Sequence, residues 1–183
     1  MPSVHPVAPP LAIAQWLNTE APLTLDALRG RVVMLHAFQM LCPGCVAHGL
    51  PQAAKAHEMF ARRDLVVIGL HTVFEHHAVT GPEALKAFVH EYRLPFPIGI
   101  DRPAAKGPIP LTMQAYELGG TPSVVLIDRE GRVRLNQLGR VDDLALGALI
   151  GELIAGGTPP GRRTGAATER GPAAACDDDA CTA

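Results

Sequence analysis

Apolar runs and segments of helical periodicity alternate along this chain. Residues 32–38 and 64–71 are apolar almost throughout, as expected of strands that are buried on both faces of a parallel sheet. Residues 96–100 predict a third, shorter strand. The segments 123–128 and 133–139 predict a hairpin that turns around Arg129, Glu130 and Gly131.

Helices are predicted where apolar residues recur at three- and four-residue intervals between these strands. Pro51 lies inside the longest of them and should kink it, because proline lacks a backbone donor. The predicted helices are 12–17 (with Trp16 as apolar anchor), 46–62, 80–92, a short one from Thr112, and one from Asp142 to about Ile154. This order of elements predicts a three-layer α/β sandwich, with a central mixed, mostly parallel sheet flanked by helices.

The chain changes character after residue 156. Residues 157–183 contain no Ile, Leu, Val, Met or aromatic side chain, so this segment cannot bury a core of its own. We therefore predict one domain over residues 1–156, with its core at about 20–155, and a disordered C-terminal tail over 157–183 that carries a pair of cysteines.

Composition and charge exclude several classes of protein. The 183 residues are 48% hydrophobic and 19% charged, which is typical of a soluble globular protein. A formal net charge of -2 gives no reason to expect nucleic acid or an anionic membrane as a partner. No apolar run approaches the ~18 residues that span a bilayer. The N-terminus lacks the pattern of a secretory signal, so we expect a cytoplasmic location.

The most informative motif is a pair of cysteines, Cys42 and Cys45, between the strand 32–38 and the helix that follows it. Residues three apart on the first helical turn share a face, so the two sulfurs can come within disulfide distance. The helix dipole favours the thiolate form of the first cysteine. A zinc site is the alternative, but only Cys176 and Cys181 could complete four thiolate ligands, and their spacing of five is loose. Redox chemistry is therefore favoured, with no metal and no organic cofactor.

The order of elements, Cys42-Pro43-Gly44-Cys45 and the distant Gly120-Thr121-Pro122 together resemble the thioredoxin fold. The lead-in at 25–33 and the hairpin at 125–133 are most similar to redoxins of the TlpA/ResA type, in the alkyl hydroperoxide reductase/thiol-specific antioxidant group. The resemblance covers roughly residues 20–155. It implies a thiol-disulfide oxidoreductase in which a cis Thr121–Pro122 bond faces the disulfide, and both residues help to bind substrate.

The resemblance also implies roles for individual residues. Cys42 would attack a disulfide and Cys45 would resolve the mixed disulfide. His36 takes the place of a buried carboxylate that moves protons for the resolving thiol in thioredoxin, so it is a candidate for proton transfer. The alternative for His36 is a packed core histidine. The expected partners are a protein or small-molecule disulfide or thiol and an electron donor or acceptor.

Two departures from the family pattern bear on function. Most relatives have Trp before the first cysteine, where this chain has Leu41. The peroxidase branch needs Pro and Thr or Ser at positions occupied here by Leu35 and Gln39. A peroxiredoxin-like thiol peroxidase is therefore the second choice among enzymes. A binding or metal-handling module that uses the same fold is the alternative outside enzymes.

Two further groups of residues could act on the cysteine pair. His71, Glu75, His76 and His77 follow a strand whose carboxyl end should lie at the functional edge of the sheet, although a solvated polar loop is the simpler interpretation. Cys176 and Cys181 could relay electrons from the tail. Three aspartates between them should raise the pKa of both thiols and slow their attack, which favours an inert chain end.

Overall fold

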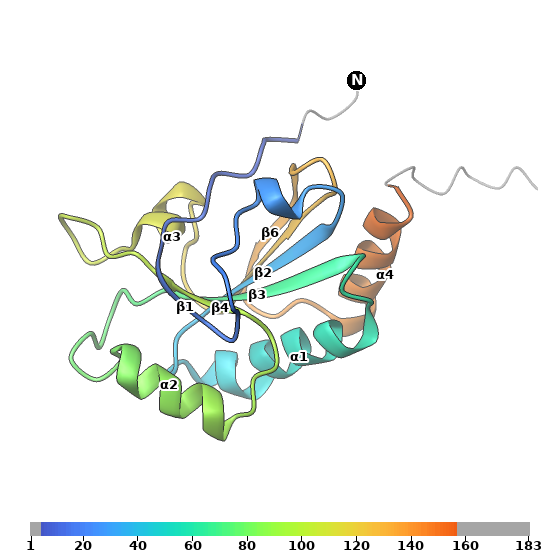
Figure 1. Cartoon of the computed structure of the whole chain (residues 1–183). Coiled ribbons are helices and arrows are strands. Elements are labelled where there is room, and N and C mark those ends of the chain that lie inside the picture. Colours follow the sequence, from blue (N-terminus) through green and yellow to red (C-terminus); the bar gives the residue numbers. More distant parts are fainter. Residues whose placement is uncertain (1–4, 157–183) are drawn as a thin grey trace, which may run out of the picture.

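The computed structural model describes residues 5–156, which fold around one six-stranded mixed sheet (Figure 1). The strands are β1 (Ile13–Leu17), β2 (Val32–Phe38), β3 (Leu65–His71), β4 (Ile98–Asp101), β5 (Ser123–Ile127) and β6 (Val133–Leu138). The helices are η1 (Asp26–Leu28), η2 (Cys45–Gly49), α1 (Leu50–Met59), α2 (Pro82–Glu91), α3 (Leu111–Ala115) and α4 (Asp143–Ile154). A central mixed sheet with helices on both sides is the architecture of a thioredoxin-like α/β sandwich. The predicted fold class is therefore confirmed.

The sheet has the strand order β1-β4-β3-β2-β5-β6. The pairs β2–β3 and β3–β4 are parallel, whereas β1–β4, β2–β5 and β5–β6 are antiparallel. The sheet is therefore mixed, as predicted, but its antiparallel pairs outnumber the parallel ones. The sequence pattern underestimated them because β1 was not expected to be a strand.

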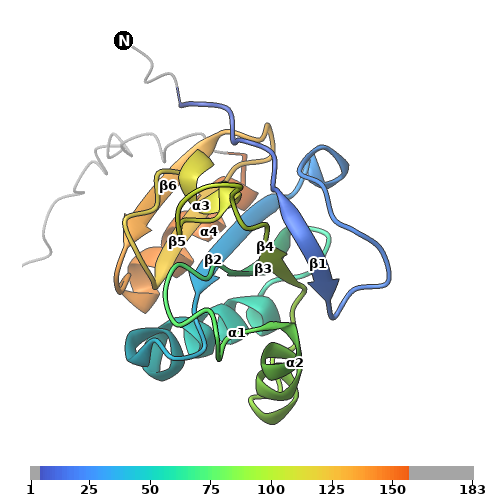
Figure 2. The same ribbon diagram turned by 90° about the vertical axis from the view of Figure 1, so that its left-hand side faces the viewer.

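Side chains of β2 alternate between two apolar layers, as the two-residue period of a strand requires. Val32, Met34 and Phe38 pack against α1, α2 and α4 on one face. Val33, Leu35 and Ala37 pack against α3, η1 and the N-terminal segment on the other face. Figure 2 shows α1 and α2 on one side of the sheet and α3 on the other. Burial on both faces explains why β2 is apolar almost throughout.

Residues 13–17, predicted to be helical, instead form the edge strand β1. Trp16 pairs with Gly99 and Leu17 with Ile98, and Trp16 packs half-buried against the apolar layer that contains α3. A segment of five residues gains little from its own helical hydrogen bonds, whereas pairing satisfies the open edge of β4. Tertiary pairing therefore overrode the local pattern.

Pro51 alters the helix after the cysteines, although not by a simple kink. Residues Cys45–Gly49 form a π-helical turn, in which the backbone N–H of Leu50 donates to the carbonyl of Cys45, and the α-helix α1 begins only at Leu50. Proline is tolerated in the first turn of a helix, where its missing N–H is not needed. The wider turn before it is of a kind that is frequently found at functional sites.

The remaining elements lie close to their predicted positions, with the hairpin, α2 and α4 shifted by no more than a few residues. Asp142 caps α4, since its side chain accepts hydrogen bonds from the backbone N–H groups of Leu144 and Ala145. In the part of the chain from residue 5 to residue 156, no helix has the length and apolar character needed to cross a membrane. The predicted tail lies outside the described residues.

Candidate active site

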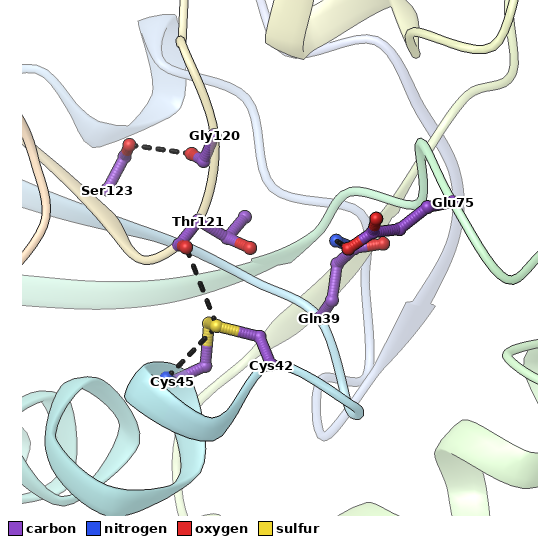
Figure 3. The surroundings of a disulfide bond; sticks show 7 residues. All are labelled: Gln39, Cys42, Cys45, Glu75, Gly120, Thr121 and Ser123. Carbon is purple, nitrogen blue, oxygen red and sulfur yellow. Dashed lines mark hydrogen bonds between the residues drawn. A yellow bond between two sulfur atoms is a disulfide. The ribbon is translucent and has the colours of Figure 1, made fainter.

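The two cysteines of the motif form a disulfide where β2 ends and the helical region begins (Figure 3). Their Cα atoms are 5.2 Å apart, within the normal range for a disulfide. Cys42 is partly exposed at the surface, whereas Cys45 is fully buried in the layer that contains α1. The difference in exposure makes Cys42 the sulfur that an incoming substrate can reach.

Backbone groups surround the exposed sulfur. The N–H of Cys45 donates a hydrogen bond to Sγ of Cys42 over 3.2 Å, and the carbonyl oxygen of Thr121 lies 3.5 Å from the same sulfur. The Cys42 carbonyl in turn accepts from the N–H groups of Cys45 and Val46. After reduction, the donor at Cys45 would stabilise a thiolate on Cys42 and so favour nucleophilic attack.

Pro122 lies against the cysteine loop, and the Thr121–Pro122 peptide bond is cis, as the family resemblance implies. A Cβ atom added at Gly44 would lie 3.4 Å from Cδ of Pro122, and one added at Gly49 would lie 3.2 Å from its Cβ. The carbonyl of Pro122 also accepts a hydrogen bond of 2.7 Å from the N–H of Gly139. The segment before β5 is therefore packed directly on both ends of the disulfide-bearing turn.

His36 lies beneath this turn, on the face of β2 that packs against α1. It is fully buried, and neither ring nitrogen has a hydrogen-bond partner in the structure. A Cβ atom at Gly49 would lie only 2.6 Å from its Nε2, so the imidazole rests on the backbone one turn after Cys45. Burial lowers the pKa of His36 to about 4, so its ring is neutral at pH 7.

A cavity of about 110 Å³ opens beside His36 and Pro122. Its mouth lies between α1 and the connection from β6 to α4, where Lys55, Arg140 and Asp143 carry the charged groups. No motif predicts this cavity, because its lining comes from segments that are far apart in the chain.

The loop after β3 approaches the disulfide through Gln39 rather than through its histidines. The buried amide of Gln39 accepts a hydrogen bond from the N–H of Phe74 and donates one to Oε1 of Glu75. Figure 3 shows Gln39 and Glu75 side by side near the disulfide. His76 and His77 are exposed. His71 is buried with its ring 5.3 Å from that of Phe38, and burial lowers its pKa to about 4. The predicted His71–His77 group is thus not a cluster.

Gln39 also bears on the peroxidase alternative. It occupies the position where peroxidases carry Thr or Ser, and its amide is used to hold the loop after β3. Leu35, at the position of the peroxidase proline, is buried within β2. Neither side chain offers the hydroxyl or loop that the peroxidase motif supplies.

The remaining candidates from the sequence are the cysteine pair of the tail and a possible metal site. Cys176 and Cys181 lie outside residues 5–156. Within those residues, no three His, Cys, Asp or Glu side chains are arranged to share a metal ion. The metal-handling alternative therefore has no donor set in the described part of the chain.

A thioredoxin-like sandwich with a disulfide at the junction of β2 and its helix defines the thiol-disulfide oxidoreductases of the redoxin class. The family model described as the AhpC/TSA family matches residues 7–136. This chain belongs to that family.

Two solved structures are about half identical to this chain. A thioredoxin-like superfamily protein is 52% identical, with a TM-score of 0.79 over 81% of this chain and 96% of its own. A thiol-disulfide isomerase from Corynebacterium glutamicum is 51% identical, with a TM-score of 0.77 over 81% of this chain and 97% of its own. StoA from Bacillus subtilis, at 18% identity and a TM-score of 0.58, shares the fold.

Curated relatives are longer proteins. NHL repeat-containing protein 2 of Gallus gallus is 30% identical over 128 residues, which are 68% of this chain and 16% of that protein. Protein DipZ of Mycobacterium bovis is 30% identical over 145 residues, 78% of this chain and 20% of that protein. The chain thus spans a fifth or less of these relatives.

Proposed function

We propose that this protein exchanges disulfides through the Cys42–Cys45 couple, with Cys42 as the attacking thiol and Cys45 as the resolving thiol. One observation carries the assignment: Cys42 is exposed and Cys45 is buried in a disulfide whose outer sulfur accepts the N–H of Cys45. The 51% identity to a thiol-disulfide isomerase supports the same chemistry.

In the reducing direction, the thiolate of Cys42 attacks one sulfur of a substrate disulfide. A mixed disulfide forms, and the other substrate sulfur leaves as a thiolate that takes up a proton. Cys45 then loses its proton and attacks Sγ of Cys42, which releases the second substrate thiol and restores the internal disulfide. Two electrons and two protons pass to the substrate in total, and the reverse sequence oxidises a dithiol.

Thr121 and Pro122 would hold the substrate beside Cys42. The Thr121 carbonyl already lies 3.5 Å from the reactive sulfur, in the segment that leads into β5. An extended substrate peptide can pair with such a segment as an added strand. Leu41, 58% exposed next to Cys42, offers an apolar contact where most relatives have Trp.

His36 would accept the proton of Cys45. Its position under the turn that begins at Cys45, its neutral ring at pH 7 and its two unpaired nitrogens all support this role. A core histidine that served packing alone would be expected to bond to a neighbouring polar group.

Substitution of each cysteine tests the assignment. In an insulin-reduction assay with dithiothreitol, Cys42→Ser should abolish turnover. Cys45→Ser should retain the first attack and accumulate a covalent adduct with a substrate disulfide, visible by mass spectrometry. Normal turnover by Cys42→Ser would overturn the proposed mechanism.

The direction of electron flow follows from the reduction potential. A value near about −270 mV would indicate a reductant, and one near about −120 mV an oxidant. Equilibration with glutathione or dithiothreitol, followed by alkylation of free thiols, measures it. The partner would accordingly be an electron donor or an electron acceptor.

The AhpC/TSA match over residues 7–136 favours thiol peroxidase activity as a second candidate. Peroxide consumption with saturating thiol separates the two functions. A peroxidase should consume hydrogen peroxide faster than it reduces insulin, and Cys42→Ser should abolish that consumption.

A further inference from the structure

The cavity beside Pro122 is lined by charged side chains as well as by a buried polar one. Its floor includes the imidazole of His36, which is fully buried and has no hydrogen-bond partner on either nitrogen. Its volume of about 110 Å³ has room for about three or four water molecules at about 30 Å³ each, or for the end of one acidic side chain. A donor at the base of a space of this size is the signature of a site for a small polar group.

The mouth of the cavity carries two positive side chains, Lys55 and Arg140, and one negative side chain, Asp143. Both oxygens of Asp143 are occupied: Oδ1 accepts from Nε2 of Gln52 over 2.6 Å, and Oδ2 lies 3.4 Å from Nζ of Lys55. These two interactions hold the pKa of the Asp143 carboxyl below its usual range. The carboxylate of Asp143 therefore neutralises Lys55.

Arg140 is the charged side chain at the mouth that has no ion-pair partner among residues 5–156. Its guanidinium contributes to the lowered pKa of Asp143, but it forms no hydrogen bond or ion pair with any side chain of residues 5–156. Arginine offers several donors in a planar fork that matches a carboxylate. The cavity thus presents an unpaired cationic donor at its mouth and, at its floor, an imidazole without a hydrogen-bond partner.

The position of the cavity connects it to the substrate. The ring of Pro122 forms part of its wall, and the carbonyl of the preceding residue, Thr121, lies beside Sγ of Cys42. The hydrogen bond from Gly139 to Pro122 holds the chain that carries Arg140 against this segment. In a substrate chain that passes Thr121, a side chain one or two residues from the reacting cysteine can therefore reach the cavity mouth.

We propose that this cavity is a carboxylate subsite, which selects disulfide substrates that carry an acidic group close to the reacting cysteine. The carboxylate accepts hydrogen bonds from the guanidinium of Arg140 and, where it reaches the floor, from the N–H of the neutral His36 ring. The acidic group belongs either to a peptide side chain or to a low-molecular-weight disulfide. This inference rests on the proposed disulfide exchange and names the substrate class that the exchange favours.

Two sets of matched substrates test the subsite and distinguish its sources. The first set is three peptide disulfides that differ only in a Glu, Gln or Lys next to the cysteine. The second is dithiodipropionate and its diamide. At low salt, the Glu peptide should have a kcat/KM about three- to tenfold above that of the Gln peptide, and the Lys peptide should fall below both. The preference should shrink as salt screens the charges. A preference confined to dithiodipropionate would assign the site to small disulfides.

Arg140→Gln should reduce the Glu-to-Gln ratio to about one and leave reduction of the Gln peptide unchanged. Arg31→Gln is the matched control, because Arg31 is half-buried next to the first residue of β2, at the end opposite the cysteines, where its guanidinium donates to the carbonyl of Ala27. Equal kcat/KM for the Glu and Gln peptides in the unaltered protein would overturn the subsite, as would a preference that survives Arg140→Gln.

Binding can be measured apart from exchange. Propionate added to the oxidised protein should shift the NMR ring resonances of His36 with saturation, and Arg140→Gln should remove the shift. Failure of every peptide to be reduced would contradict the proposed function, whereas reduction without acidic preference and without the propionate shift would contradict only the subsite.

Discussion

Two buried polar side chains, on the two strands that flank β3, differ in their hydrogen bonding. Asp101 on β4 is 3% exposed, and its carboxylate accepts hydrogen bonds from the hydroxyl of Thr72 and the N–H groups of Thr112 and Met113, at 2.8–3.0 Å. His36 on β2 is 0% exposed and has no partner for either nitrogen. The first group is fully satisfied, and the second is left unsatisfied.

The difference separates a structural polar group from a reactive one. Asp101 ties β3, β4 and the start of α3 together, and so fixes the chain that leads to the segment with Pro122. An unpaired buried group costs free energy, so a fold that keeps one next to its reactive centre gains something other than stability.

The largest effect should come from acid. His36 and His71 each have a pKa lowered to about 4 by burial, so between pH 6.5 and 4 the unfolded chain binds more protons than the folded one. Stability is therefore present above pH 6.5 and lost as pH falls through this window, by roughly 3 kcal/mol for each histidine. Burial raises the pKa of Asp101, which works in the opposite direction at the acid end.

Urea unfolding at pH 7 and pH 4.5 measures this loss. His36→Leu and His71→Leu should each make stability less dependent on pH, and the double variant should do so most. His77→Gln, at an exposed loop position, should leave the dependence unchanged. Equal stability of the unaltered protein at both pH values would contradict the prediction.

Removal of the satisfied group should be the most damaging single substitution. Asp101→Ala leaves the two N–H groups at the start of α3 and the Thr72 hydroxyl without their acceptor. We expect a loss of about 3 kcal/mol in the free energy of unfolding, measured by urea denaturation at pH 7. Asp26→Ala is the control, since that side chain is 92% exposed and should change stability by less than about 0.5 kcal/mol. A loss as small as that control would mean that the three hydrogen bonds contribute little.

Removal of the imidazole of His36 should have the opposite effect on stability and should slow the reaction. His36→Leu replaces an unpaired imidazole by an apolar side chain and should raise stability at pH 7 by about 1 kcal/mol. Without the proton acceptor, release of the mixed disulfide should slow about tenfold. Stopped-flow fluorescence or quenched alkylation across pH 5–9 follows this step.

His71→Leu is a matched control, because His71 is buried on the same face of the adjacent strand, where its ring packs against Phe38. It should change stability in the same direction and leave the release rate unaltered. Equal slowing in both variants would assign the effect to packing and remove the proton-transfer role from His36.

The sequence predicted the parts of the site that depend on local chemistry. The cysteine pair, its strand and Pro122 were recognisable from residue types and spacing, and the fold followed from periodic apolar segments. Contacts made by ordinary residues were not recognisable. Nothing in the sequence marks Gly49 as the contact of His36, Arg140 as an unpaired charge or Gln39 as the anchor of a loop 35 residues later.

Strand β1 was missed for a related reason. Its partner β4 is 83 residues further along the chain at the Trp16–Gly99 pair, and no local pattern carries that information. Long-range pairing decided both this strand and the excess of antiparallel pairs. The sequence is therefore most informative where structure depends on one segment and least informative where two distant segments complete each other.

The smallest effect should come from a single methyl group placed under His36. In Gly49→Ala the new Cβ would lie 2.6 Å from Nε2 of the ring and 3.2 Å from Cβ of Pro122, so one of the neighbours must move. The better helix propensity of Ala offsets part of the crowding, which leaves a net loss of about 1 kcal/mol. Gly147→Ala in α4 meets no atom within 4 Å and should gain up to about 1 kcal/mol by propensity alone.

Thermal unfolding and the release rate of the mixed disulfide should respond together in Gly49→Ala, because the displaced ring is the proposed proton acceptor. In Gly147→Ala, only stability should change. If Gly49→Ala were as stable as Gly147→Ala and released substrate at the normal rate, the imidazole would not be confined by the turn after Cys45. The contact between Gly49 and His36 would then not explain why His36 is reactive while Asp101 is structural.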